Sequence, residues 1–116
     1  MKTANEFVEN LKDVFAAFGA IEARRMFGGY GLYHDGLMFA LVSGDVLYLK
    51  TDKQSLASFT GLDLQPFEFE KKGKMVETSY YTAPEIIFDE PDAAKEWASR
   101  AYEAALRTRK PKKSRQ

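Results

Sequence analysis

Residues 35–50, Asp-Gly-Leu-Met-Phe-Ala-Leu-Val-Ser-Gly-Asp-Val-Leu-Tyr-Leu-Lys, decide the fold of this chain. The Asp-Gly pair at 35–36 predicts a tight β-hairpin turn, because both central residues of a type I′ turn need a positive φ. The uninterrupted apolar run at 37–42 predicts a central strand that is buried on both faces. The turn residues at 43–45 then lead into a partner strand over 46–50. Together these residues predict an antiparallel meander.

The residues on either side of this hairpin extend the sheet. Upstream, residues 21–27 contain no strand breaker and predict a strand, which Gly-Gly-Tyr-Gly at 28–31 interrupts. Downstream, residues 66–71 alternate, with two phenylalanines on one face and two glutamates, Glu68 and Glu70, on the other. A Lys-Gly turn returns the chain through a second strand. We interpret the two carboxylates as a solvated outer face and not as an acid–base pair.

Three segments with helical spacing of apolar residues surround these strands. The first has a capping-box pattern at 3–6, an apolar stripe over 7–18 and a terminating glycine. The second is short and spans 51–61. The third begins at Pro91 and carries a stripe of small and aromatic residues around Trp97. We expect Trp97 to anchor the core, because a lone tryptophan on such a stripe buries a large apolar area.

The order of these elements predicts the fold class. Local hairpins dominate, which indicates a mainly antiparallel sheet of about five strands with helices on one face. The expected architecture is a two-layer α+β domain with the order α-β-β-β-α-β-β-α. We expect this domain to occupy residues 1–106, with its folded core in residues 4–106. Residues 107–116 are expected to form a disordered basic tail, because like charges repel and bury nothing.

Composition excludes several classes of protein. A chain of 116 residues, 45% hydrophobic and 29% charged, has the size and mixture of one ordinary globular domain. The lack of cysteine and the single histidine exclude a disulfide framework, a cysteine nucleophile and a multi-histidine metal site. No apolar run approaches the ~18 residues of a membrane helix, and the N-terminus lacks the apolar core of a signal peptide. We therefore expect a cytoplasmic protein without a membrane contact.

The formal net charge is zero, but the charges are unevenly placed. Residues 107–116 contain six basic and no acidic residues, which leaves 11 basic and 17 acidic residues, a net charge of −6, in residues 1–106. An acidic body repels phosphate, so a nucleic acid is expected to bind through the tail only. The candidate nucleic-acid contacts are the basic residues of the tail: Arg107, Arg109, Lys110, Lys112, Lys113 and Arg115.

No combination of residues predicts catalysis, a metal site or a cofactor site, so we expect a non-enzymatic protein. His34 lies at a predicted hairpin turn beside Asp35, where a histidine is usually a solvated surface residue, so we do not expect it to be catalytic. The glycine-rich segment at 28–31 does not lead into a helix N-terminus, which a phosphate loop needs. We interpret its glycines as room for a β-bulge or for close approach of the terminal helices.

Arg24 and Arg25 are the least ordinary local feature. Adjacent residues of a strand point to opposite faces, so one arginine is expected to lie beneath the helices and to need a buried partner. The other is expected to be exposed and available to a carboxylate or phosphate. The candidate partners of the buried arginine are acidic residues: Glu6, Asp13, Glu22 and Glu96. The candidate contacts with a partner molecule or an anion are Arg24, Arg25, Gly28 and Gly29.

A string of motifs runs along the predicted sheet: Arg-Arg-Met-Phe-Gly-Gly-Tyr-Gly-Leu-Tyr at 24–33, Asp-Gly-Leu-Met-Phe-Ala-Leu at 35–41 and Leu-Tyr-Leu-Lys at 47–50. This string, with the helix around Trp97, resembles the N-terminal domain of the TfoX/Sxy family over about residues 4–106. The resemblance implies a stand-alone N-terminal domain, with helices packed on one antiparallel sheet. The founding members are regulators of natural competence that act on transcription with a cyclic-AMP receptor protein. The family has no established catalytic residues, which implies a regulatory adaptor.

We therefore expect a non-enzymatic regulatory or protein-interaction module, with a protein partner that belongs to the transcription machinery, acting as a monomer or homodimer. Two alternatives stay open. One is a weak nucleic-acid binder that works through the basic tail, recognisable by salt-dependent binding that truncation after Leu106 abolishes. The other is a small ligand-binding protein or enzyme with its site near Arg24, Arg25 and the 28–31 segment, recognisable by a deep pocket there.

Overall fold

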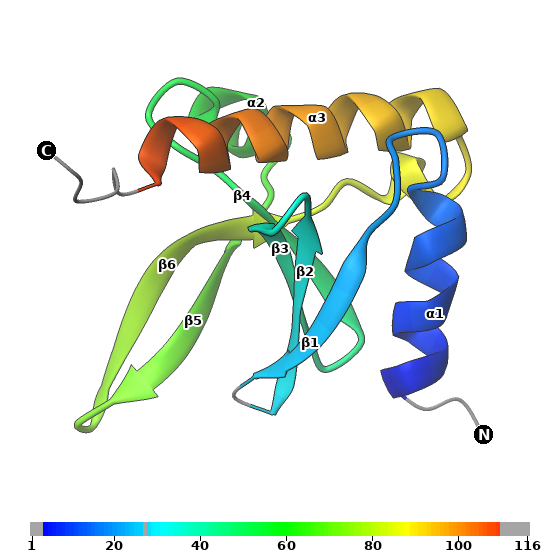
Figure 1. The fold of residues 1–116 in the computed structure, drawn as a ribbon. Coiled ribbons are helices and arrows are strands. Elements are labelled where there is room, and N and C mark those ends of the chain that lie inside the picture. Colours follow the sequence, from blue (N-terminus) through cyan, green and yellow to red (C-terminus); the bar gives the residue numbers. More distant parts are fainter. Residues whose placement is uncertain (1–3, 27, 110–116) are drawn as a thin grey trace, which may run out of the picture.

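The computed structural model describes residues 4–26 and 28–109, with side chains from residue 6 onward. The described residues form one antiparallel sheet with the strand order β1-β2-β3-β4-β6-β5, together with helices (Figure 1). In chain order the elements are α1 (Ala4–Val14), β1 (Glu22–Met26), β2 (Gly29–His34), β3 (Leu37–Ser43), β4 (Val46–Lys50), α2 (Leu56–Thr60), β5 (Pro66–Lys71), β6 (Lys74–Thr82), the 3₁₀ helix η1 (Glu85–Phe88) and α3 (Pro91–Thr108).

The predicted α+β class and element order are confirmed, but the sheet has six strands where about five were expected. The additional strand arises at Gly28, which has a φ of 78° in the left-handed region that glycine adopts without strain. The chain turns there, and β1 and β2 pair as a hairpin with Arg24 opposite Gly31. The interruption expected at 28–31 is therefore a turn at Gly28, and residues 29–31 form the start of β2.

The helices lie on one side of the sheet (Figure 1). Leu32, Ala40 and Leu49 face one another across β2, β3 and β4 on this side, and all three are fully buried. Phe15, in the turn that follows α1, packs edge-on against Phe39 with 5.9 Å between ring centroids. The register of β2 and β3 shifts just after Leu32, and this irregularity lets Phe39 and Ala40 both face the core.

Small residues let α3 lie close to β3 and β4. The alanines on its inner side are buried: Ala94, Ala98, Ala101, Ala104 and Ala105. Trp97 lies among them, is 9% exposed, and meets the ring of Phe59 edge-on with 5.0 Å between centroids. The expectation that Trp97 anchors the core is confirmed.

The expectation for β3 holds only for one face. β3 is a central strand, but Met38 and Leu41 on the side opposite the helices are half-buried. Their partial exposure follows from the two-layer architecture, because the helices cover one side of the sheet and no described helix covers the other. The prediction of burial on both faces is therefore wrong.

The ends of the described chain differ from the expected boundaries in one respect. α3 continues through Thr108, past the expected domain boundary at residue 106. The capping box predicted at 3–6 begins outside the described residues, although α1 starts at Ala4. Among the described helices, none is long and apolar enough to cross a membrane.

Candidate functional site

The side of the sheet that lies opposite the helices is the candidate site, and we call it the open face. Residues that pair directly across strands share a face, and one such row runs from Arg24 through Gly31 and Leu41 to Tyr48. A parallel row places Lys50 opposite Tyr80. The long side chains that form the open face are Arg24, Met26, Tyr33, Met38, Leu41, Tyr48, Lys50, Phe67 and Tyr80.

Gly31 forms the floor of the open face near its β1 edge. A Cβ atom at Gly31 would lie 2.7 Å from Sδ of Met26 and 3.1 Å from Sδ of Met38, with the Tyr33 ring 3.2 Å away. The missing side chain therefore makes the space in which two thioethers and an aromatic ring gather. Unbranched, polarisable methionine side chains adapt their shape readily, which suits them to a contact surface.

Two cations of the open face lie over tyrosine rings. The guanidinium of Arg24 is 4.4 Å from the centroid of Tyr33, and its Nη2 lies 3.3 Å from a carboxylate oxygen of Glu22. The ammonium of Lys50 is 5.2 Å from the centroid of Tyr80 and donates to Oγ of Ser79 at 2.6 Å. A ring face attracts a cation through its quadrupole, so each tyrosine holds its cation in place.

Burial and charge alter the titration of this second pair. Burial lowers the pKa of Lys50 from its usual value, and the carboxylate of Asp52 partly opposes that shift. Burial raises the pKa of Tyr80 to about 12, and the neighbouring Tyr33 hydroxyl adds to the effect. Tyr33 lies on β2 and Tyr80 on β6, with β3 and β4 between them in the sheet. The open face is concave, because Phe67 of β5, at the far end of the strand order, lines the same small hollow as Met26 and Gly29 of the first two strands.

A small apolar hollow lies on the open face. Its lining includes Met26, Gly29 and Leu41 from the first strands and Phe67 from β5. Phe67 also meets Tyr48 edge-on with 5.1 Å between ring centroids, so this side chain reaches past β6 to a residue of β4. The hollow holds about 40 Å³, whereas pockets for small molecules hold about 300–1,000 Å³. It has room for one aliphatic side chain, and the deep pocket expected of a small-molecule site is not found at this place.

The structure corrects the interpretation of the two arginines. Arg24 and Arg25 point to opposite sides of β1, as expected, but both are exposed. β1 is an edge strand at the end of the sheet, and the helix layer leaves Arg25 open to solvent. The predicted buried ion pair is therefore wrong. Of the acidic partners considered, Glu22 does contact Arg24, but at an exposed position on the same strand.

The glycines next to them have structural roles. Gly28 makes the turn between β1 and β2, and its Cβ position has no neighbour within 4 Å. A Cβ atom at Gly29 would lie 2.1 Å from the carbonyl oxygen of Val42, so that residue allows β2 to approach β3. Close approach is therefore to a neighbouring strand, and the expected approach of the terminal helices to these glycines is not found. Of the four candidate contacts, Arg24 and Gly29 border the open face.

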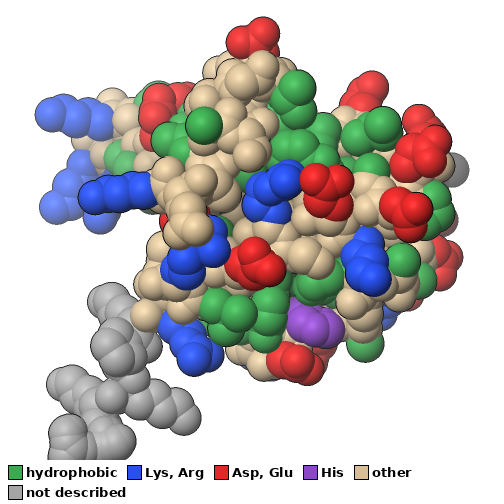
Figure 2. All heavy atoms as spheres, turned by 90° about the horizontal axis from the view of Figure 1, so that it is seen from above, with side chains coloured by type: hydrophobic (Ala, Val, Ile, Leu, Met, Phe, Trp, Pro, Cys, Tyr) green, Lys and Arg blue, Asp and Glu red, His purple; other side chains and the backbone are tan. Residues whose placement is uncertain are grey.

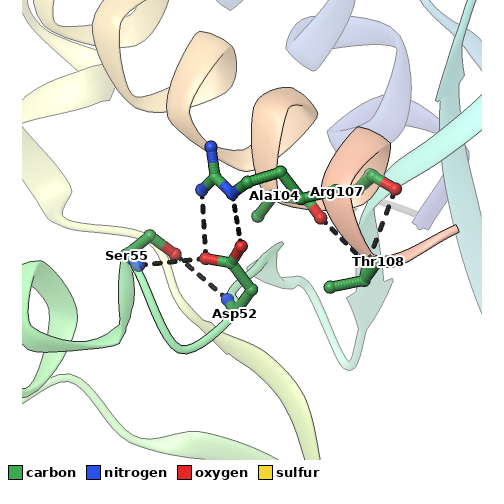
Figure 3. Close-up of polar contacts among 6 residues, drawn as sticks. Asp52, Ser55, Ala104, Arg107 and Thr108 are labelled. Atoms are coloured by element: carbon green, nitrogen blue, oxygen red, sulfur yellow. Dashed lines mark hydrogen bonds and ion pairs between the residues drawn. The ribbon is translucent and has the colours of Figure 1, made fainter.

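The tail candidates divide into two groups. Arg107 lies in α3 and is committed to Asp52: its Nε and Nη2 donate to the two carboxylate oxygens at 2.5 and 3.0 Å (Figure 3). Asp52 also accepts from the backbone N–H of Ser55, and these bonds hold the pKa of its carboxyl well below the usual range. Arg109 is exposed at the end of α3. The other candidates lie outside the described residues: Lys110, Lys112, Lys113 and Arg115.

His34 is not the solvated turn residue that the sequence suggested. Its ring lies 4.6 Å from the centroid of Phe18 and 5.0 Å from that of Tyr102, on the helix side of the sheet. Its Nδ1 donates to the carbonyl oxygen of Ala20 at 2.7 Å. Through this hydrogen bond, His34 at the end of β2 holds the segment that follows α1. Within the described residues, no group of three or more His, Asp and Glu side chains is arranged to hold a metal ion.

Sequence reasoning missed most of the open face. Tyr48 and Lys50 alternate with buried Leu47 and Leu49, which is the pattern of a strand with one covered and one open side. Tyr80 carries the same signal on β6. This alternation is present in the sequence, but the continuous apolar run of β3 indicated a sheet that is buried on both faces.

Figure 2, which looks down on α3, shows the opposite side of the molecule, with acidic and basic side chains interspersed.

The fold and the open face define a small α+β domain, with the described helices on one side of an antiparallel sheet and an aromatic and cationic surface on the other. Comparison with known proteins gives the family. The profile of the TfoX N-terminal domain matches residues 13–105. The chain belongs to the TfoX/Sxy family.

Two curated relatives are similar along most of the chain. The DNA transformation protein TfoX1 of Aliivibrio fischeri is 30% identical over 98 residues, which are 84% of this chain and 47% of that protein. Protein Sxy of Escherichia coli is 28% identical over 105 residues, which are 90% of this chain and 50% of that protein. The chain thus spans about half the length of these relatives.

Proposed function

We propose that this chain is a non-enzymatic regulatory module that acts on transcription by binding a protein partner through its open face. The observation that carries the proposal is the open face itself, a concave surface of half-buried aromatic and apolar side chains that no described element covers. Contiguous apolar surface of this kind is typical of interaction sites. Membership of the TfoX/Sxy family, with a relative named as a DNA transformation protein, supports the regulatory part.

The arrangement of polar groups favours binding over catalysis. The described histidine packs against Phe18 and Tyr102, so it has no geometry for proton transfer to a substrate on the open face. The hollow beside Gly29 is too small to enclose a substrate. An enzyme or small-ligand protein with its site near Arg24 and the glycines is therefore less well supported than an interaction module.

Nucleic-acid binding through the tail gains no support from the described part of the tail. The fork of Arg107 is engaged with both oxygens of Asp52, so contact with a phosphate would require that pair to break. Arg109 is exposed and carries a single charge. The acidic body, with a net charge of −6 over residues 1–106, also opposes a phosphate backbone.

The test compares transcripts in the native host after deletion of the gene and complementation. We expect the wild-type chain to restore the transcripts that deletion changes, and a double variant of the open face, Arg24→Glu with Lys50→Glu, to fail. The control is Arg100→Gln, which removes an arginine that stacks on Trp97 at 4.5 Å on the helix side. Full complementation by the folded double variant, or the absence of any transcript change on deletion, would contradict the proposal.

A further inference from the structure

The charges of the strands are sorted between the two sides of the sheet. By register, Lys71 pairs with Lys74 and lies on the same side as Phe69, Val76 and Tyr80. The acidic residues of this hairpin occupy the other side: Glu68, Glu70 and Glu77. With Arg24 and Lys50, the described strand residues of the open face carry four cations and one carboxylate, Glu22. The open face is therefore basic in a domain whose body is acidic.

Arg24 and Lys50 are held in place before a partner binds, so they are ready to contact its acidic groups. The guanidinium of Arg24 lies over the Tyr33 ring, and its 3.3 Å contact with Glu22 involves one nitrogen of a group that carries five N–H donors. Its side chain is 55% exposed, so a carboxylate can reach it. A guanidinium held on a ring loses less freedom when it binds a carboxylate bidentately. Lys50 supplies a second, partly buried charge near Tyr80.

The same geometry argues against a nucleic acid on this face. Single-stranded nucleic acids bind sheets by stacking bases on free aromatic rings. Here the cations themselves occupy the faces of Tyr33 and Tyr80, and Phe67 packs against Tyr48. The hollow lined by Met26, Leu41 and Phe67 holds about 40 Å³, which suits an aliphatic side chain and not a base. Methionines around it can adapt to a leucine, isoleucine or valine.

We propose that the open face binds an extended acidic segment of a partner protein, in which carboxylates that reach Arg24 and Lys50 flank an aliphatic side chain that enters the Met26–Leu41–Phe67 hollow. This inference rests on the proposed function and names the chemistry of its partner. The segment spans the concave sheet, whose six strands at ~4.8 Å spacing measure roughly 24 Å across, or about seven extended residues. The lysines at the hairpin turn, Lys71 and Lys74, extend the attraction beyond its end.

The test is selection of random peptides about twelve residues long, displayed on phage, against the whole chain. We expect enriched peptides to contain Asp or Glu on both sides of Leu, Ile or Val. A synthetic copy of an enriched peptide is then titrated by fluorescence polarisation against wild type, Arg24→Gln, Lys50→Gln and Leu41→Ser. We expect each of these substitutions to weaken binding by about ten-fold or more. Replacing the acids of the peptide by their amides is expected to have the same effect.

Arg100→Gln is the matched control. Arg100 also stacks on an aromatic ring and pairs with a glutamate, but on the helix side, so its loss is expected to leave peptide binding unchanged. Circular dichroism confirms that each variant is folded. Mixed-sequence DNA and RNA single strands of about twelve nucleotides form a separate arm, and binding of either that Arg24→Gln abolishes would overturn the proposal in favour of a nucleic acid.

The remaining outcomes separate the two proposals. Enriched peptides that lack acids but lose binding on Leu41→Ser would overturn the acidic chemistry and leave the open face as a protein-binding site. Enriched peptides that bind all open-face variants equally, or no enrichment at all, would overturn the acidic segment. In that case the transcript experiment decides separately whether the open face has a regulatory role.

Discussion

Two arginines of this protein lie over aromatic rings at nearly the same distance, yet they belong to different layers of the molecule. Arg100 lies 4.5 Å from the centroid of Trp97 and pairs with Glu96 at 3.0 Å. Arg24 lies 4.4 Å from the centroid of Tyr33 and contacts Glu22 at 3.3 Å. The first ring belongs to the core between α3 and the sheet, whereas the second belongs to the open face. Similar local geometry therefore occurs on both sides of the sheet, and only the layer in which the pair lies separates a contact against the core from one on the open face.

The largest expected effect tests the covered side. Trp97→Ala removes a side chain that is 9% exposed and meets Phe59 edge-on, so the cavity and the lost burial are expected to cost about 3–5 kcal/mol of unfolding free energy. Urea denaturation of wild type and variant measures the difference. A loss below about 1 kcal/mol would mean that the helix layer is not the main source of stability.

Two glycines of β2 give the next contrast, since both lie on the open face but face different neighbours. Gly29→Ala places a methyl group against the backbone carbonyl of Val42, whose strand must shift, and we expect a cost of about 1–3 kcal/mol. Gly31→Ala meets side chains alone: the sulfur ends of Met26 and Met38, which can rotate away, and the edge of the Tyr33 ring at 3.2 Å. Its effect on unfolding free energy is expected to be the smaller one. Thermal melts of the pair check the order, and equal effects would contradict the distinction between backbone and side-chain neighbours.

The contact between Asp52 and Arg107 predicts a pH dependence. The pKa of Asp52 is lower in the folded chain than its ordinary value of about 3.9, so the pair stabilises the fold above that pH. This stabilisation is lost as the pH falls through the folded pKa, because the carboxyl becomes protonated. Asp52→Asn is expected to be less stable than wild type at pH 7, and the difference in urea midpoint should narrow on acidification below about pH 4. A difference that does not change with pH would exclude this carboxylate as its source.

The smallest expected effects lie at the exposed arginines. Arg24→Gln and Arg25→Gln are each expected to change the free energy of unfolding by no more than about 0.5 kcal/mol, since neither side chain is buried. Differential scanning calorimetry of both variants is the measurement. A loss of several kcal/mol at either position would restore the idea of a buried ion pair beneath the helices.

The sequence predicted the layers of the fold well because local signals determine them. The Asp35-Gly36 turn, the apolar run of β3 and the alanine stripe around Trp97 each specify an element without reference to distant residues. It predicted the strand count less well. A glycine is itself a turn signal, and greater weight on Gly28, which adopts a positive φ, gives β1 and β2 as separate strands.

The candidate site was harder to predict because it depends on which strand lies at an edge and which face stays uncovered. Alternation along β1 correctly separated the two arginines, but only the sheet order places β1 outside the helix layer and so exposes both. The contact between Asp52 and Arg107 joins residues 55 positions apart, which no local pattern indicates. Of the four candidate contacts, Arg24 and Gly29 border the open face, but the tyrosines and Lys50 that complete it were not identified.

Because β6 pairs with its two neighbours over different lengths, local stability differs from one part of the sheet to another. β4 and β6 are joined only near one end, where Tyr48, Leu49 and Lys50 face Thr82, Tyr81 and Tyr80. Beyond that end, β5 and β6 continue as a two-stranded ribbon that projects away from the helices (Figure 1). A ribbon of two strands is marginally stable on its own, so its distal part opens at a lower free energy than β3, which has a neighbour on each side. Amide hydrogens from Glu68 to Glu77 will therefore exchange with solvent through local opening. Those of β3 will exchange only when the whole domain unfolds.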